Sequence, residues 1–460
     1  MSKKICVIGA GLSGSELSYQ LASRGMDVSL YEARLDNKYN DAVHLTTQFA
    51  ELVCSNSFRG NELHNAAGLL KQEMRLLGSM LVSVADKTAV PAGTALAVSR
   101  NDFSSEVTKI LSSLKEIKII PEEVSDLRTV LDKFDLVAVC AGPVASSSLS
   151  RSLSDIMGRE YLYFYDAIAP LVHAGSIDMD ICFRASRYAD AQENGGDYIN
   201  CPMTKDEYCD LVDSLIRAEK SPIHPGDDGI FFRGCMPIEA MAEDSRDNLL
   251  NGPMRGDGLI DPKTGRNPYA AVQLRQDNAA GNIYNMVGFQ TRLMYPEQER
   301  LFRKIPGLGK AEFLRFGSMH RNTYVNAPEV LNSDMSLKAE PRVFLCGQIS
   351  GVEGYIESIA HSMVVCSSIY KRINGDELWT IPSYTAVGSL RDYLTKASPK
   401  DFQPMKMNFG LIPPLSDEEK KIYVSKGNRR FENKLGFSKR SITFLEKSSS
   451  ASLIFSKKSD

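Results

Sequence analysis

The first 31 residues alternate between apolar runs and polar turns in a pattern that predicts a βαβ unit. Residues 4–10 (KICVIGA) form an uninterrupted apolar run, which is typical of a strand covered on both faces of a parallel sheet. Residues 15–24 carry apolar side chains at helical spacing before Gly25, and residues 27–31 form a second apolar run. A strand, a helix and a strand in about thirty residues make one βαβ unit.

The same alternation of apolar runs and polar turns continues to about residue 150 and returns near residue 341. It predicts further helices at 69–77, 103–114 and 364–370, and strands within 90–98 and at 117–120, 134–140 and 341–347. Residues between about 150 and 332 differ, because they are rich in aromatic and acidic residues and in Gly/Pro loops and lack βαβ alternation. We therefore predict four segments: a first domain part at 1–150, an inserted α+β domain at 151–332, a second part at 333–415, and a basic tail at 416–460 that is weakly structured after about residue 425.

A glycine-rich turn lies between the first predicted strand and helix, where a dinucleotide-binding fingerprint is expected. Its glycines permit a tight turn, a close backbone approach to a pyrophosphate, and close packing of helix on strand. Glu32 ends the second strand, where a carboxylate binds a ribose 2′-hydroxyl and disfavours a 2′-phosphate, so FAD or NAD is preferred over NADP. The predicted cofactor-binding residues of the turn are Gly9, Ala10, Gly11, Leu12, Ser13 and Gly14.

A second strand and turn late in the chain favours FAD over NAD. The strand at 341–347 leads into Gly347, Gln348 and, after a short Gly-rich segment, Gly354. Two-part FAD domains return to their cofactor in this way, whereas a protein that binds both FAD and NAD would carry two N-terminal-type fingerprints. The predicted fold class is α/β: an FAD-binding, Rossmann-like domain of the glutathione-reductase type with an inserted α+β domain.

Composition and charge narrow the class of protein. With 43% hydrophobic and 24% charged residues, collagen-like, coiled-coil and wholly disordered chains are excluded. The net charge of −3 argues against nucleic-acid binding, but it conceals an asymmetry. Residues 426–460 hold nine Lys and Arg against three acids, a net charge of +6. No apolar run is long enough for a transmembrane helix, and the N-terminus enters a strand directly, so we expect a cytoplasmic protein.

The nine cysteines form neither a CxxC pair nor a zinc-spaced cluster, so no metal site is predicted. Most lie in apolar strands, where packing explains them. Cys54 and Cys235 instead lie in polar, turn-prone segments, where thiolates do chemistry, although a structural role remains open for both at this point. His320 lies in a polar run near several basic residues, which indicates either a solvated helix face or a phosphate-binding patch.

The chain closely resembles the TrmFO family of folate- and FAD-dependent tRNA (uracil-5-)-methyltransferases. The resemblance extends in order from residue 1 to about 415. The matching stretches include VIGAGLSGSE (7–16), FAELVCSNS (49–57), ADKTAVPAGTALAVSR (85–100), GCMPIEAMA (234–242), GPMRGDGLIDPKTG (252–265), PYAAVQLRQDNAAGNIYNMVGFQT (268–291), MHRNTYVNAP (319–328) and GQISGVEGY (347–355).

The resemblance implies methylation of C5 of a uridine in the tRNA T-loop. It implies 5,10-methylenetetrahydrofolate as carbon donor and FAD, reduced by NADH or NADPH, as reductant. Two catalytic cysteines of the family match Cys54 and Cys235, and we expect Cys235 to be the C6 nucleophile and Cys54 the acid/base or second thiol. A folate-stacking histidine of the family matches His320. We expect tRNA and folate as partners, with no membrane and no obligate protein partner.

Three alternatives remain. The same chemistry could act on a uridine of 23S ribosomal RNA. An MnmG (GidA)-type FAD-dependent tRNA-modification protein would share the fingerprint but would lack the GCMPIE and VQLRQDNAAG stretches. A plain flavin oxidoreductase would need neither paired loop cysteines nor a basic tail.

Overall fold

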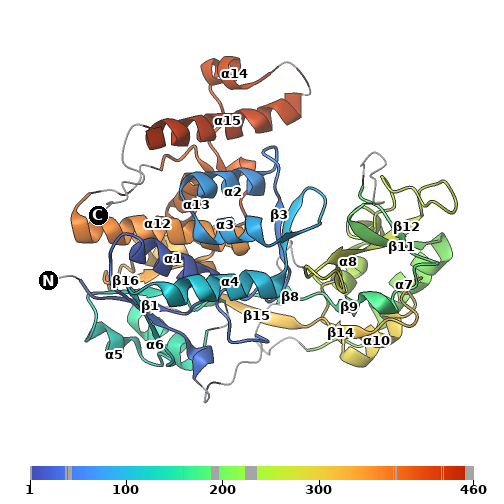
Figure 1. Ribbon diagram of the computed structural model, residues 1–460, viewed down its shortest axis with the longest axis horizontal. Coiled ribbons are helices and arrows are strands. Elements are labelled where there is room, and N and C mark those ends of the chain that lie inside the picture. The colour runs from blue at the N-terminus through green and yellow to red at the C-terminus, as the bar shows by residue number, and fades with distance from the viewer. Residues whose placement is uncertain are drawn as a thin grey trace.

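A five-stranded parallel sheet forms the centre of the larger of two lobes (Figure 1). The computed structural model describes residues 3–36, 39, 44–143, 145–158, 160–187, 196–222, 236–376, 378, 381–425, 427 and 429–450. All four strand pairs of this sheet are parallel, and every residue of its first strand is buried, as the apolar run predicts. The strand order is β16 (Val343–Leu345), β7 (Leu136–Val139), β1 (Ile5–Ile8), β2 (Val28–Tyr31) and β6 (Ile117–Ile120).

Helices cover the sheet and bring distant parts of the chain together. The helix that follows the glycine turn, α1, packs against α12 from the late part of the chain. A small antiparallel sheet, β3 (Ser57–Gly60), β5 (Ala95–Val98) and β4 (Ala89–Val90), lies beside them. The helices of this lobe are α1 (Leu12–Ala22), α2 (Ala66–Leu76), α3 (Met80–Lys87), α4 (Arg100–Ser113), α5 (Leu127–Leu131), α6 (Ser147–Met157), α11 (Ala327–Val330), α12 (Tyr355–Asn374) and α13 (Ala386–Lys396).

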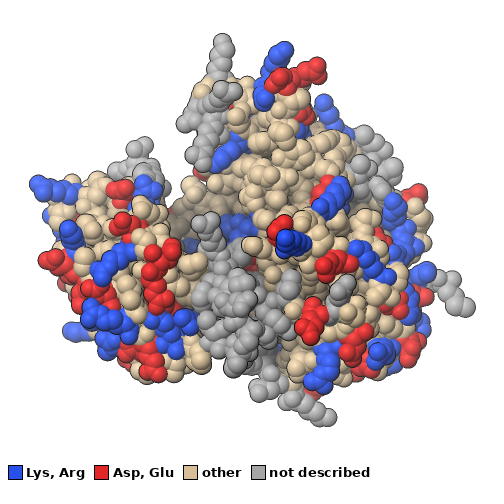
Figure 2. Space-filling view, turned by 180° about the vertical axis from the view of Figure 1, so that it is seen from behind, with Lys and Arg blue, Asp and Glu red and all other residues tan. Residues whose placement is uncertain are grey.

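The second lobe is built on a six-stranded antiparallel sheet with its own apolar core. Figure 2 shows a hollow where the two lobes meet, with Lys and Arg side chains within it. The strand order is β10 (Phe183–Arg184), β11 (Tyr198–Met203), β12 (Ala270–Gln276), β13 (Ile283–Met286), β9 (Leu171–His173) and β14 (Phe313–Arg315). Its helices are α7 (Lys205–Arg217), α8 (Ile238–Asp244), α9 (Arg246–Leu250) and α10 (Tyr295–Phe302).

A two-stranded antiparallel ribbon, β8 (Leu162–Ala167) and β15 (Met319–Tyr324), connects the lobes. One strand carries the chain out to the second lobe and the other returns it, as an inserted domain requires. The predicted α/β fold class is confirmed. No helix among the described residues is both long and apolar enough to cross a membrane.

The prediction that the tail is weakly structured after about residue 425 is wrong for residues 429–450, which form a helix. Two helices, α14 (Asp417–Tyr423) and α15 (Arg429–Ser450), follow α13, and α15 packs on α2 (Figure 1). Polar contacts fix this helix: Ser438 Oγ donates to the Leu63 carbonyl (2.6 Å) and Ser441 Oγ to Glu73 Oε1 (2.5 Å). The side chain of Arg440 is also buried, and it donates to Glu419 Oε2 (3.1 Å).

Candidate active site

The glycine turn after β1 has the geometry that a bound pyrophosphate requires. Gly9 has a φ of +96°, and a Cβ on Gly14 would lie 1.8 Å from the Gly9 carbonyl oxygen, so both positions exclude a side chain. A Cβ on Gly11, in contrast, would meet nothing within 4 Å. Gly11 is also the N-cap of α1, and no side chain caps that helix end. The open space and the N–H groups of the first turn fit the diphosphate of a dinucleotide.

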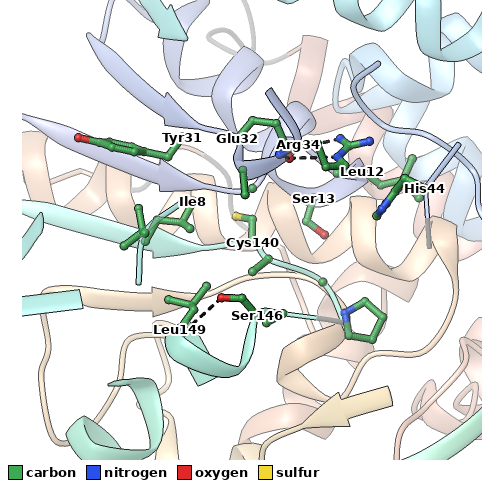
Figure 3. A pocket seen from close by; sticks show the side chains of 18 of the residues that line it. Ile8, Leu12, Ser13, Tyr31, Glu32, Arg34, His44, Cys140, Ser146 and Leu149 are labelled. Atoms are coloured by element: carbon green, nitrogen blue, oxygen red, sulfur yellow. Dashed lines mark hydrogen bonds and ion pairs between the residues drawn. The ribbon is translucent and has the colours of Figure 1, made fainter. Parts of the chain in front are cut away.

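Glu32 lies at the end of β2 and is held by two groups. Its Oε2 accepts the backbone N–H of Ala10 (2.7 Å), and its Oε1 accepts Arg34 Nε (3.0 Å), as Figure 3 shows for the ion pair. Burial raises the pKa of the Glu32 carboxyl, but the Arg34 charge and these hydrogen bonds outweigh it and bring the pKa below its usual value. Glu32 is therefore a carboxylate, which can accept hydrogen bonds from ribose hydroxyls. Arg34 is occupied by this carboxylate and by the Gln48 carbonyl (3.0 Å), so it offers little to a 2′-phosphate.

A cavity of about 370 Å³ continues from this turn (Figure 3). Leu12 and Ser13 line it, with Cys140 from the end of β7 between Ile8 and Ser13 in the close-up. Gln348 and Tyr355, which come from the late part of the chain, complete the lining. The two-part wall predicted from the sequence is present around one cavity, and the cavity suits FAD.

The late turn is fixed to the early one through α12. Gly347 has a φ of +82°, and a Cβ there would lie 2.0 Å from Ser13 Oγ, so the two turns touch. The backbone N–H of Gly347 donates to Nδ1 of buried His361 (3.0 Å), whose pKa burial lowers to about 3. This histidine is therefore neutral and can accept that bond. Gly354 is the N-cap of α12, and its φ of +112° requires glycine.

Cys54 lies within hydrogen-bonding distance of a residue that lines this cavity. The Tyr355 hydroxyl donates to Cys54 Sγ (3.0 Å) and accepts the backbone N–H groups of Cys54 (2.8 Å) and Ser55 (3.2 Å). Burial, and the nearby Cys54, raise the pKa of Tyr355 well above its usual value, so the phenol stays protonated. Tyr355 thus links the dinucleotide pocket to the candidate thiol.

Three arginines from both lobes surround the loop that carries Cys54. Arg100 begins α4, whereas Arg275 and Arg315 belong to β12 and β14 of the second lobe. A positively charged surrounding of this kind favours anions at the thiol, whether a thiolate or a reacting substrate. Their contacts with the loop are Arg100 Nη1 to the Leu52 carbonyl, Arg275 Nη2 to Ser55 Oγ (2.9 Å), Arg275 Nε to Asn56 Oδ1 (3.1 Å), and Arg315 Nη1 to the Val53 carbonyl (3.0 Å).

The structure does not test the predicted roles of two site residues, Cys235 and His320. Cys235 lies outside the described residues. His320 is placed by its backbone in β15, opposite Asp166 of β8. The roles of these residues stay predictions.

The basic residues that precede His320 in the chain are divided between two environments. Arg300, Arg303 and Lys304 are paired with acids of the second lobe, so they do not form a free cationic patch. Arg315 instead points toward the Cys54 loop. Tyr355 and the arginines at 100 and 275 were missed by sequence reasoning, although all three lie within stretches that carry the family resemblance.

The fold and the dinucleotide pocket place the chain among the GidA-like α/β proteins. A family profile described as "Glucose inhibited division protein A" matches residues 4–377. The structure of Aquifex aeolicus GidA in its form II crystal superposes with a TM-score of 0.69 at 15% identity, over 99% of this chain and 74% of that chain. The likeness in structure shows a shared fold.

Sequence relatives narrow the class further. A TrmFO, "Methylenetetrahydrofolate--tRNA-(uracil-5-)-methyltransferase", of Natranaerobius thermophilus is 47% identical over 93% of this chain and 97% of its own. The enzyme of the same name from Moorella thermoacetica is 50% identical over 91% of this chain and 94% of its own. The chain belongs to the TrmFO family, as its motifs predict.

Proposed function

We propose that this protein methylates C5 of a uridine in tRNA, with 5,10-methylenetetrahydrofolate as the source of the carbon. The names of relatives that match almost the whole chain support the reaction. The structural observation that supports this proposal is the hydrogen bond from Tyr355 Oη to Cys54 Sγ (3.0 Å). It joins a thiol to the wall of a dinucleotide pocket, which a C5 methylation with a flavin reductant needs and a plain oxidoreductase does not.

FAD would be held by both glycine turns. The N–H groups at the start of α1 would bind the diphosphate, and Glu32 a ribose. When bound, FAD supplies the reducing electrons that turn a transferred methylene into a methyl group. We propose NADH or NADPH as the source of those electrons. His320, from its position on β15, is proposed to contact the folate.

The thiols would activate the pyrimidine. Uracil C5 is a weak nucleophile until a thiolate adds to C6, which places the electron pair of the C5–C6 double bond on C5 and the C4 oxygen. After the carbon unit is attached, a base must take the proton from C5. We assign the addition to Cys235 and the proton transfer to Cys54, whose sulfur the Tyr355 hydroxyl orients. The arginines around the loop would stabilise the anionic states.

The decisive experiment maps the product. Purified protein is incubated with tRNA transcript, 5,10-methylenetetrahydrofolate and NADH or NADPH, and the methylated uridine is located by mass spectrometry of nuclease fragments. We expect 5-methyluridine in the T-loop. A parallel reaction with a 23S ribosomal RNA transcript tests the alternative substrate, and product only there would overturn the tRNA assignment. Protein that purifies without a flavin spectrum would contradict the FAD assignment.

A further inference from the structure

The three arginines around the Cys54 loop differ in how their guanidinium groups are used. The Nε and Nη2 atoms form the edge of a guanidinium that presents two parallel N–H donors. In Arg100 this edge binds the Asp277 carboxylate (2.6 and 3.1 Å). In Arg275 it binds oxygens of the loop itself. In Arg315 both atoms are buried and have no hydrogen-bond partner among the described residues.

Buried guanidinium donors without an acceptor lower the stability of the folded protein. A buried donor without an acceptor loses its hydration without compensation, and the loss is greater for a charged group. Burial, together with the neighbouring Arg100, lowers the pKa of Arg315, yet a guanidinium stays protonated in proteins. The side chain is not loose, since Nη1 donates to the Val53 carbonyl (3.0 Å), next to Cys54. Its Nε–Nη2 edge, for which the described part of the chain offers no acceptor, is therefore held in place near the thiol.

We propose that the Nε–Nη2 edge of Arg315 binds the oxyanion that forms on the uracil ring, which makes Arg315 a catalytic residue. The inference rests on the proposed function. In the addition step a sulfur–C6 bond forms, the C5–C6 π pair moves toward C4, and the C4 oxygen takes up the negative charge, while no proton leaves the ring. Two N–H donors aimed at that oxygen stabilise the transition state more than the neutral ground state.

Burial favours the base over an RNA phosphate as the group bound. Phosphates of an RNA backbone stay at the surface of the complex, whereas the free edge of Arg315 is shielded from solvent. A base that enters the thiol site would bring its C4 oxygen to that depth. The inference does not depend on whether Cys54 or Cys235 forms the bond to C6.

The test uses FAD-loaded protein, 5,10-methylenetetrahydrofolate and an RNA hairpin of the T-arm with 5-fluorouridine at the target position. Once the carbon unit is attached to C5, fluorine cannot leave as the proton does, so the thioether adduct accumulates and is counted on a denaturing gel. In Arg315→Gln and Arg315→Lys we expect the adduct to form about 10²-fold more slowly at saturating RNA, with RNA affinity and flavin content unchanged. Lysine keeps the charge and can reach the Val53 carbonyl, but it cannot present two parallel donors.

Arg303→Gln is the matched control, because Arg303 lies in the same lobe and pairs with Glu299 (2.9 Å) away from the loop. If Arg315→Gln loses its flavin, the adduct rate of Arg315→Lys serves as the test instead. An adduct rate within about threefold of the parent in the lysine variant overturns the inference while the proposed function stands. Weaker RNA binding with an unchanged rate at saturation would indicate a phosphate contact and also overturns it. If the parent protein neither methylates RNA nor forms an adduct, the proposed function fails, and the inference with it.

Discussion

The contact between Ser441 of α15 and Glu73 of α2 can be tested by Ser441→Ala. Glu73 is fully buried and accepts three hydrogen bonds: from Ser441 Oγ (2.5 Å) and from the backbone N–H groups of Ala386 (2.7 Å) and Val387 (2.9 Å). It thereby joins α2, α13 and α15. A hydrogen bond to a charged acceptor contributes about 1.5–3 kcal/mol, so the variant should weaken the docking of α15 by about 2 kcal/mol while Glu73 is ionised.

The pH dependence of this effect has a defined sign. Burial raises the pKa of Glu73 from 4.5 to about 7, even though the three hydrogen bonds lower it. A carboxyl whose pKa is higher in the folded protein contributes stability below its unfolded pKa and loses it as pH rises through about 7. The serine hydroxyl favours the ionised form, so its removal costs more at pH 8 than at pH 6.

Hydrogen exchange measures the docking of α15 directly. Mass spectrometry of peptides from α15 gives protection factors, which correct for the intrinsic pH dependence of exchange. We expect protection at pH 8 to fall about 30-fold in Ser441→Ala, which corresponds to about 2 kcal/mol, and to fall less at pH 6. Ser448→Ala is the control, because its hydroxyl donates to the Phe444 carbonyl within the same helix (2.9 Å). Equal losses in both variants, or equal losses at both pH values, would refute the reasoning.

Three further predictions concern catalysis, folding and RNA binding. Cys54→Ala and Cys235→Ala should each abolish methylation while FAD stays bound, and near-normal turnover measured with either variant would remove that cysteine from the mechanism. Gly14→Ala should yield little flavin-loaded protein, because its Cβ would lie 1.8 Å from a carbonyl oxygen; a normal flavin absorbance per chain would contradict the proposed turn. Lys439 and Lys447 are both exposed on α15, and replacing both with Glu should lower RNA affinity and the salt dependence of binding without changing flavin content. An unchanged salt dependence in a binding titration would show that α15 does not contact the RNA.

The dinucleotide-binding part of the candidate site can be predicted from local sequence. The glycine turn can be predicted from the sequence because the turn, the close packing and the phosphate approach that require glycine all involve residues close in the chain. Glu32 can be predicted as well, because it ends the second strand of the same βαβ unit. Residue spacing alone places Cys54 only in a polar loop, because its partner Tyr355 is 301 residues away in the chain, and the family resemblance is needed to expect it in the site. The side chains of Arg275 and Arg315 reach the loop from another lobe, which no periodicity predicts.

The docked tail helix escaped prediction for a different reason. Several of the buried positions of α15 are Ser438, Arg440 and Ser441 rather than apolar residues. Hydrophobic periodicity therefore underestimates how much of this helix is covered. Its docking depends on individual hydrogen bonds to groups such as Glu73, and these become visible only once the tertiary structure is known.

The strand order of the parallel sheet has a consequence for how the protein is made. The edge strand β16 pairs with β7, which precedes it by about two hundred residues, and the whole second lobe lies between them in the chain. A chain still on the ribosome that ends before Tyr355 lacks part of the wall of the dinucleotide pocket and the hydroxyl that orients Cys54. The second lobe, whose six strands all fall between residues 171 and 315, can reach its own fold first. Cofactor capture thus becomes a late event in biosynthesis, which follows the folding of the inserted lobe.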